Sequence, residues 1–132
     1  MKPDGGSLIG FGSSGPGTTP FQAFDPVRGT PIEPSFPSAA PEDVERAVQL
    51  AAAAAPAWAR LTGAQRAAFL RRIADNLETK TADLVARAMR ETGLPEARLK
   101  GEVERTIGQH RLYGEAAERG DWLDARIETA QP

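Results

Sequence analysis

The sequence has 132 residues, which is enough for one domain with a core but too few for two large domains. Its 16 basic and 18 acidic side chains give a formal net charge of −2, so no general attraction to nucleic acid or to anionic membranes is expected. Because there is no cysteine and only one histidine, His110, the sequence excludes disulfides, a cysteine nucleophile and a histidine metal cluster within these residues, and we predict no metal site.

Targeting and membrane signals are not recognisable in the sequence. The longest apolar run, at residues 51–55, is far too short to cross a bilayer. No apolar signal core follows Met1 and Lys2. We therefore expect a cytoplasmic protein that binds neither membranes nor nucleic acid.

Residues 1–40 are expected to form a small antiparallel β ribbon with loops. Strands are predicted at residues 8–11, 21–24 and 32–36, and turns at residues 10–17 and 25–29. Prolines inside and beside the third strand confine it to a sheet edge. Such a ribbon needs another element to pack on.

Helical patterns begin at Pro41 and continue to about residue 119. The first helix should end near residue 55, and a second should start at the capping box formed by Thr62 and Gln65. A third helix is expected at about residues 81–92 and a fourth from about residue 95 to residue 119, with Gly93 and Gly120 as stops. The side chains expected to be buried by the first three helices are Val44, Ala47, Val48, Ala51, Phe69, Leu70, Ile73, Ala74, Leu77, Leu84, Val85, Ala88 and Met89.

The fourth helix should be the largest element, and its pattern is not simply amphipathic. Leu99, Val103 and Ile107 form one apolar stripe, and Leu112 with Ala116 forms a second apolar edge. A polar row lies between these edges and consists of Glu102, Arg105, Thr106, Gln109 and Tyr113. The solvent side is predicted to carry Lys100, Glu104, Arg111, Glu115 and Glu118.

Two interpretations of this polar row are open. In one, Glu102 and Arg105 form a local ion pair with no further role. In the other, the row faces a polar cavity or a ligand, because arginine offers a fork of donors for a carboxylate or carbonyl. Gly101 and Gly108 lie one heptad apart and could let another backbone approach.

Other candidate functional residues have plain structural explanations. The glycines at residues 10–17 lack the lysine and the following helix of a phosphate loop, so a hairpin turn is expected. The cluster of Arg66, Arg71 and Arg72 is expected to form a solvated helix face. We interpret His110 as a structural histidine, and the tryptophans Trp58 and Trp122 are interpreted as core or interface anchors. No catalytic or cofactor-binding residue is predicted.

The order of three segments carries a family resemblance. These segments are FQAFDPVRGTPIEPSF, SAAPEDVERAVQLAAAAAPAWARLTGAQRAAFLRRIADNLE and ETGLP. Together they resemble the N-terminal part of aldehyde dehydrogenases. The spacing E-x-x-R-T-x-x-Q, which here comprises Glu102, Arg105, Thr106 and Gln109, is similar to the branch that oxidises α-ketoglutaric semialdehyde (2,5-dioxovalerate).

The resemblance implies an incomplete, mainly α part of the α/β aldehyde dehydrogenase fold. It implies that residues 1–40 form a β ribbon and that residues 41–132 form the helical segment of the cofactor-binding domain. It also implies an NAD or NADP cofactor, an aldehyde substrate and homo-oligomers for the full-length enzyme. The family's catalytic cysteine, cofactor loop and oligomerisation ribbon have no counterpart here, so we expect the chain alone to bind no cofactor and to be inactive.

The resemblance also bears on the polar row. The family's corresponding helix borders the substrate tunnel, which implies tunnel-side positions for Glu102, Arg105, Thr106 and Gln109. The alternative from a different class is a non-catalytic helical module whose apolar faces bind a protein partner. A third alternative is a phosphate-binding protein that uses the glycines of residues 10–17.

Overall fold

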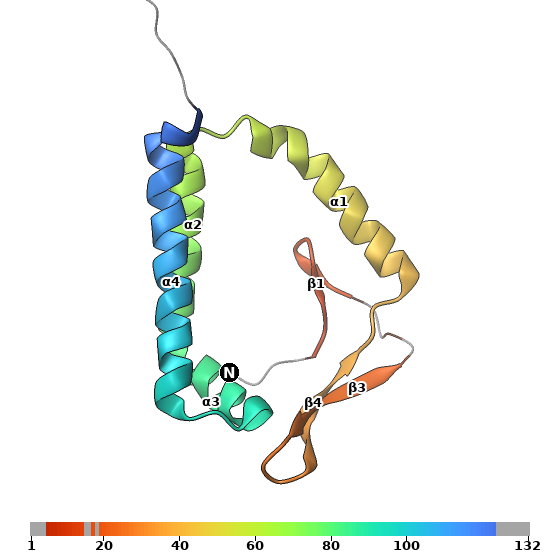
Figure 1. The fold of residues 1–132 in the computed structure, drawn as a ribbon. Coiled ribbons are helices and arrows are strands. Elements are labelled where there is room, and N and C mark those ends of the chain that lie inside the picture. The colour runs from red at the N-terminus through yellow and green to blue at the C-terminus, as the bar shows by residue number, and fades with distance from the viewer. Residues whose placement is uncertain (1–4, 15–16, 18, 124–132) are drawn as a thin grey trace, which may run out of the picture. The chain divides into compact units, whose positions relative to one another are not determined.

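The computed structural model describes residues 5–14, 17 and 19–123 (Figure 1). These residues form four α-helices, two antiparallel strand pairs and a short 3-10 helix, η1 (Asp121–Leu123). The chain divides into two compact units, the first made of Met1–Arg60 with Ala82–Leu99 and the second of Leu61–Thr81 with Lys100–Pro132. The mainly helical fold with a small antiparallel ribbon confirms the fold class expected from the sequence.

The first strand pair is a short hairpin in the first unit. β1 (Leu8–Ile9) pairs antiparallel with β2 (Gly12–Ser13). Gly10 in the turn has a φ of 63°, a conformation that glycine adopts without steric cost. The expected strand at residues 8–11 is therefore too long, because Phe11 lies in the turn with its side chain exposed.

The second strand pair contains the turn predicted at residues 25–29. β3 (Pro20–Asp25) pairs antiparallel with β4 (Thr30–Pro37). The Asp25 side chain is buried at the start of the turn. Its Oδ1 accepts hydrogen bonds from the backbone N–H groups of Val27 and Arg28, both at 3.0 Å. This side-chain turn explains why aspartate at this position favours a reversal of the chain.

A small core forms where the second strand pair meets α3 (Thr81–Thr92). Ile32 on β4 is only 1% exposed. The rings of Phe21 and Phe36 stack across the two strands with centroids 5.7 Å apart. The guanidinium of Arg87 on α3 lies 5.9 Å from the centroid of Phe36, in a cation–π arrangement. The ribbon therefore has the packing partner that its size requires.

α1 (Pro41–Ala59) starts where the sequence predicts but extends further. Ala40 provides no side-chain cap, so the acids Glu42 and Asp43 in the first turn favour the positive end of the helix dipole. Pro56 lies inside the helix instead of ending it. The predicted end near residue 55 is therefore wrong by about one turn.

The burial predicted for α1 is also wrong, since no residue of this helix is buried. Val44 is 54% exposed and Val48 is 59% exposed. The β1–β2 hairpin instead approaches another side of the helix, where a Cβ on Gly10 would stand 3.2 Å from Cδ1 of Leu50. The predicted apolar face is thus real in the sequence, but the described part of the first unit does not cover it.

Local capping residues in the sequence correctly predict where the next two helices begin and end. α2 (Gly63–Thr79) has both halves of the capping box. The backbone N–H of Thr62 donates to Oε1 of Gln65 at 2.9 Å, and the backbone N–H of Gln65 donates to Oγ1 of Thr62 at 3.2 Å. α3 has the predicted bounds and is followed by Gly93, whose φ is 69°.

α4 (Glu96–Arg119) is the longest helix among the described residues, with 24 residues. Gly120 follows it with a φ of 72°, as expected for a residue just past a helix end. The predicted stripe is confirmed at Leu99 and Ile107, which are 8% and 6% exposed. The second apolar edge is not buried, because Leu112 is 57% exposed.

In the second unit, α2 and α4 lie side by side and antiparallel (Figure 1). Their backbones approach closely where the side chains are smallest. A Cβ on Gly63 would overlap the carbonyl oxygen of Ala117, and a Cβ on Gly114 would stand 3.4 Å from the carbonyl oxygen of Ala67. Ala67 is fully buried at this contact. Small residues therefore determine the spacing of the two helices.

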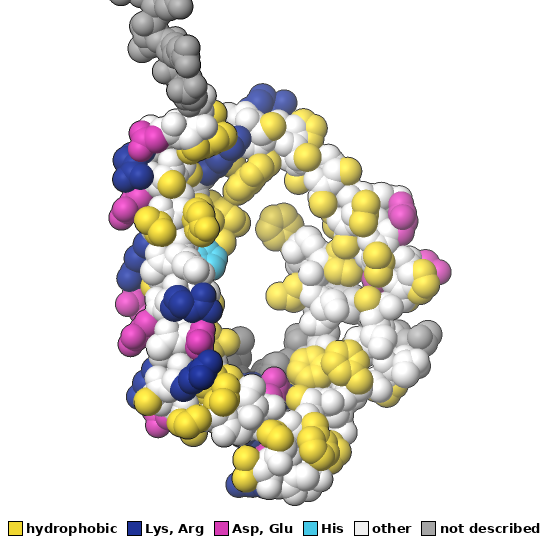
Figure 2. Space-filling view, in the orientation of Figure 1, with side chains coloured by type: hydrophobic (Ala, Val, Ile, Leu, Met, Phe, Trp, Pro, Cys, Tyr) yellow, Lys and Arg dark blue, Asp and Glu magenta, His cyan; other side chains and the backbone are white. Residues whose placement is uncertain are grey.

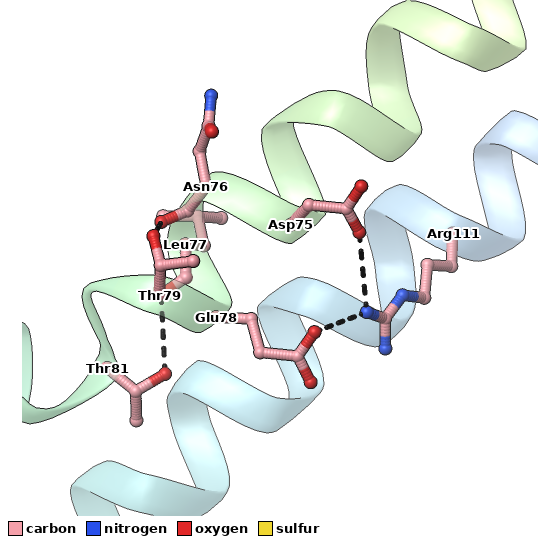
Figure 3. A network of polar contacts seen from close by, with 7 residues as sticks. All are labelled: Asp75, Asn76, Leu77, Glu78, Thr79, Thr81 and Arg111. Atoms are coloured by element: carbon pink, nitrogen blue, oxygen red, sulfur yellow. Dashed lines mark hydrogen bonds and ion pairs between the residues drawn. The ribbon is translucent and has the colours of Figure 1, made fainter.

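Ion pairs join the same two helices (Figure 3). Arg111 on α4 donates to Oε2 of Glu78 at 2.7 Å and lies 3.6 Å from Oδ1 of Asp75, both on α2. Arg71 on α2 pairs with Glu118 on α4. These hydrogen bonds and charges raise the pKa of both arginines above the ordinary value. Arg111 and Glu118 lie on the solvent side as predicted, and both also pair with residues of α2.

Several large side chains that were expected to be buried are partly exposed. The core residues Ala74 and Val85 are buried as predicted, at 0% and 3% exposure. Phe69 is 49% exposed, and the tryptophans Trp58 and Trp122 are 45% and 63% exposed. Leu84 and Met89 are exposed as well. A helix face becomes buried only when another element covers it, and periodicity alone does not show whether that element is present.

Candidate functional site

The polar row on α4 is the candidate site predicted from the sequence. Its centre is the pair of Glu102 and Arg105, one helical turn apart. Nε of Arg105 donates to Oε2 of Glu102 at 3.1 Å, and a terminal nitrogen of Arg105 donates to the same oxygen at 2.7 Å. The side chains are 61% exposed for Arg105 and 45% exposed for Glu102. The ion pair expected from the spacing is therefore present, on an accessible surface.

Two further side chains of this surface bond to the backbone of α4. Thr106 Oγ1 donates to the carbonyl oxygen of Glu102 at 2.8 Å. Nδ1 of His110 lies 2.9 Å from the carbonyl oxygen of Thr106. Because a carbonyl oxygen only accepts, Nδ1 carries the proton in this contact and Nε2 is directed elsewhere. This hydrogen bond is consistent with the structural role predicted for His110.

The structure brings Glu102, Arg105 and Thr106 together through these hydrogen bonds, and Gln109 lies on the same helix with its side chain exposed. The expectation that Gly101 and Gly108 admit another backbone is not met among the described residues, because a Cβ at either position would meet nothing within 4 Å. Close approach between α2 and α4 occurs instead at two other glycines, Gly63 and Gly114, which the sequence did not single out.

The charges of the row include the ion pair of Glu102 and Arg105. Arg105 donates two hydrogen bonds to one carboxylate oxygen of Glu102, and its other N–H groups can reach a second acceptor. Such an arrangement can bind a carboxylate or polarise a carbonyl, and the glutamate sets the orientation of the guanidinium.

The other candidates do not develop into sites. Residues 10–13 of the glycine run lie in the β1–β2 hairpin, as the turn interpretation predicts, and residues 15, 16 and 18 lie outside the described part. In the arginine cluster, Arg71 is engaged by Glu118. Among residues 5–14, 17 and 19–123, no group of three or more histidine, aspartate and glutamate side chains could hold a metal ion.

The second unit contains a small pocket. The pocket lies at the start of α2 and is separate from the polar row. It is lined by Leu61, Gly63, Arg66, Ala117, Trp122 and Leu123. Within the described part of the chain, no helix combines the length and the apolar character needed to cross a membrane.

The interhelical ion pairs are the polar feature that sequence reasoning missed. Arg111 and its partners Asp75 and Glu78 are more than thirty residues apart in the sequence. Helical periodicity places a side chain on a face of its own helix but does not say which other helix packs there. A hairpin prediction that paired the small residues of α2 with those of α4 would have brought these charges together.

Comparison with known proteins gives a consistent result. Residues 13–130 match the model of the aldehyde dehydrogenase family. The chain is 45% identical over its whole length to alpha-ketoglutaric semialdehyde dehydrogenase 2 of Azospirillum brasilense, and 40% identical over 83% of its length to the alpha-ketoglutaric semialdehyde dehydrogenase of Acinetobacter baylyi. It spans 25% and 21% of the lengths of these two proteins.

A solved structure supports the same relationship. The crystal structure of succinate-semialdehyde dehydrogenase from Burkholderia pseudomallei superimposes on 86% of this chain with a TM-score of 0.77 and 28% sequence identity. Only 24% of that protein takes part in the match. The fold described above is thus one part of a larger family fold. By its sequence, and with a matching structure, the chain belongs to the aldehyde dehydrogenase family.

Proposed function

We propose that this chain supplies the N-terminal part of an aldehyde dehydrogenase that oxidises α-ketoglutaric semialdehyde to a carboxylate with NAD or NADP. The observation that carries the proposal is the 45% identity, over the whole chain, to the Azospirillum protein of that name. In this proposal residues 1–40 form a ribbon and residues 41–132 form helices of the cofactor-binding domain. The enzyme would be a cytoplasmic homo-oligomer.

The chemistry of the reaction is assigned to parts of the enzyme outside this chain. The nicotinamide cofactor accepts the hydride when it is bound, and no residue of this chain is assigned to hold it. The sequence contains no cysteine, so this chain does not supply the cysteine nucleophile of the family. An assay of the purified 132-residue chain with α-ketoglutaric semialdehyde and NAD or NADP should show no turnover, and measurable turnover would contradict this assignment.

The proposed role of this chain is to line the substrate tunnel with Glu102, Arg105, Thr106 and Gln109. α-Ketoglutaric semialdehyde carries a carboxylate at the end opposite its aldehyde. Arg105 has N–H groups beyond the two that bond to Glu102, and these would bind that carboxylate. Glu102 would hold the guanidinium in place, while Thr106 and Gln109 would offer a hydroxyl and an amide along the same surface.

The test requires an active enzyme that contains this chain. One is obtained by replacing the matching quarter of the Azospirillum relative with the 132 residues. In this chimera, Arg105→Ala should raise KM for α-ketoglutaric semialdehyde by about 10-fold or more, because a charge-assisted hydrogen bond contributes roughly 1.5–3 kcal/mol. KM for an uncharged aldehyde of similar length should change little.

A matched control is Arg119→Ala, since Arg119 is another α4 arginine, is 62% exposed and pairs with Asp121. It should leave both KM values unchanged. If Arg105→Ala lowered the melting temperature and impaired both substrates equally, the pair of Glu102 and Arg105 would be structural and the tunnel assignment would fail.

A further inference from the structure

The substrate of the proposed function differs from simpler semialdehydes at one carbon atom. α-Ketoglutaric semialdehyde has a keto group next to its carboxylate. The compound 5-oxopentanoate has the same length and the same carboxylate but carries a methylene group at that carbon. A contact with the carboxylate alone, as proposed for Arg105, does not distinguish these two compounds. Because a keto oxygen accepts hydrogen bonds and donates none, a side chain that recognises it must supply a donor.

The hydrogen bonds within α4 show which donors near the polar row are already used. Thr106 Oγ1 donates its only hydrogen to the carbonyl oxygen of Glu102 at 2.8 Å, so this hydroxyl can only accept a further bond. Nδ1 of His110 is occupied in the same way by the carbonyl oxygen of Thr106, at 2.9 Å. The carboxylate of Glu102 accepts from Arg105 and has no hydrogen to donate. None of these three side chains therefore offers a donor to a keto oxygen in this arrangement.

Gln109 and Tyr113 are the other members of the row that carry donors. Gln109 follows Arg105 by four residues, so their Cβ atoms are neighbours on the helix surface, roughly 5–6 Å apart. Tyr113 follows Arg105 by eight residues, which corresponds to about 12 Å along the helix axis. The carboxylate and the keto group of a 2-oxo acid lie on adjacent carbon atoms. Gln109 is therefore the donor nearest to the carboxylate that Arg105 would hold.

The carboxamide of Gln109 has the chemistry that a keto oxygen requires. Its NH2 group provides two N–H donors and carries no charge. Charged side chains of both signs lie along the pair of helices α2 and α4 (Figure 2), and Arg105 already supplies the positive charge for the carboxylate. A neutral donor at the keto oxygen favours the 2-oxo acid over its methylene analogue, because the analogue leaves the amide without an acceptor.

We propose that Gln109 is the residue that selects a 2-oxo acid, by donating a hydrogen bond from its carboxamide to the keto oxygen while Arg105 holds the adjacent carboxylate. This assignment rests on the proposed function, because it requires an enzyme in which the polar row faces the substrate. It extends that function by dividing recognition between two side chains. Arg105 selects for the carboxylate, and Gln109 selects for the 2-oxo group.

The experiment uses the chimera of this chain with the Azospirillum relative and compares three aldehydes, which are α-ketoglutaric semialdehyde, 5-oxopentanoate and pentanal. Gln109→Leu keeps a side chain of similar size and removes the amide. It should lower kcat/KM for α-ketoglutaric semialdehyde by about 3- to 10-fold, the range expected for one neutral hydrogen bond. It should leave kcat/KM for 5-oxopentanoate and for pentanal unchanged. Arg105→Ala should instead impair both carboxylates equally and spare pentanal.

The matched control is Gln49→Leu, which makes the same chemical change on α1 and should leave kcat/KM for all three aldehydes unchanged. A second measurement does not depend on turnover. The dicarboxylates 2-oxoglutarate and glutarate differ only in the 2-oxo group, and a ligand raises the melting temperature of the protein that binds it. The chimera should be stabilised more by 2-oxoglutarate than by glutarate, and Gln109→Leu should abolish this difference.

Equal losses of kcat/KM for α-ketoglutaric semialdehyde and 5-oxopentanoate in Gln109→Leu would overturn the proposal, as would no loss for either. Loss of the preference in Thr106→Val instead of Gln109→Leu would also overturn it. In these cases the expected effect of Arg105→Ala would leave the proposed function standing. A folded chimera that shows no turnover and no stabilisation by 2-oxoglutarate would contradict the proposed function, and this proposal with it.

Discussion

A Cβ atom on Gly63 would overlap the carbonyl oxygen of Ala117, so the start of α2 lies directly against the backbone of α4. No side chain longer than hydrogen fits there unless the helices separate. At Gly114, a Cβ would stand 3.4 Å from the carbonyl oxygen of Ala67, which is an ordinary van der Waals contact. The second unit is therefore sensitive to the size of a few small residues rather than to a large apolar core.

Gly63→Ala should destabilise the second unit. The added methyl group forces the helices apart, and overpacking of this kind typically costs about 1–3 kcal/mol. Gly108→Ala is the matched control, because a Cβ there meets nothing within 4 Å and alanine favours a helix over glycine by about 0.5–1 kcal/mol. Thermal melts followed at 222 nm should show a lower melting temperature for Gly63→Ala and a higher one for Gly108→Ala. A rise for both would show that the close contact is absent in solution.

Removing the cap of α2 should also lower stability. Thr62→Ala loses the acceptor for the N–H of Gln65, and loss of such a cap costs about 0.5–2 kcal/mol. Thr62→Ser keeps the hydroxyl and should behave as the wild type. Urea unfolding curves measure both changes, and equal midpoints for the alanine and serine variants would exclude a contribution from the cap.

Arg111→Ala should lower the melting temperature more at low salt than at high salt. Arg111 is 45% exposed, so ions in solution screen its attraction to Asp75 and Glu78. The raised pKa of Arg111 means that its contribution is fully present at neutral pH and is lost only when the pH rises through that pKa, far above neutral. Melts between pH 7 and pH 9 should therefore show no loss that originates at Arg111. Arg72→Ala, at an exposed position of α2, is the control and should show a smaller salt-dependent change.

Val85→Ala should destabilise the first unit by roughly 2 kcal/mol, because removal of buried methyl groups loses transfer free energy and leaves a cavity. Val85 is 3% exposed on α3. Val44→Ala makes the same chemical change at a position that is 54% exposed and should cost far less in the isolated chain. Chemical unfolding of both variants tests the difference. Similar losses would mean that α1 is covered in solution, for example by self-association.

The boundaries of the helices could be predicted because their signals are local. The capping box at Thr62 and Gln65, and the glycines that end α3 and α4, act within a few residues of the boundary they determine. Pro56 is the exception. Its effect on α1 depends on whether the helix tolerates one missing hydrogen bond, and the structure shows that it does.

Burial was harder to predict because it depends on distant elements. Periodicity identified an apolar side of α1, but Val44 and Val48 on that side are 54% and 59% exposed. The charged face of α4 is exposed as predicted, but periodicity did not predict that Arg111 pairs with two acids of α2. Spacing along one helix was sufficient for the pair of Glu102 and Arg105. Whether that pair faces a tunnel depends on polypeptide that a single helix pattern does not describe.

The contact between Nδ1 of His110 and the carbonyl oxygen of Thr106 has a practical consequence. The chain contains no other histidine, so its imidazole gives a single set of ring resonances in an NMR spectrum. With Nδ1 protonated by this contact, Nε2 carries the lone pair of the neutral ring. His110 is next to Gln109 and one turn beyond Thr106. Its Nε2 chemical shift should therefore change when a ligand or another side chain approaches this side of α4.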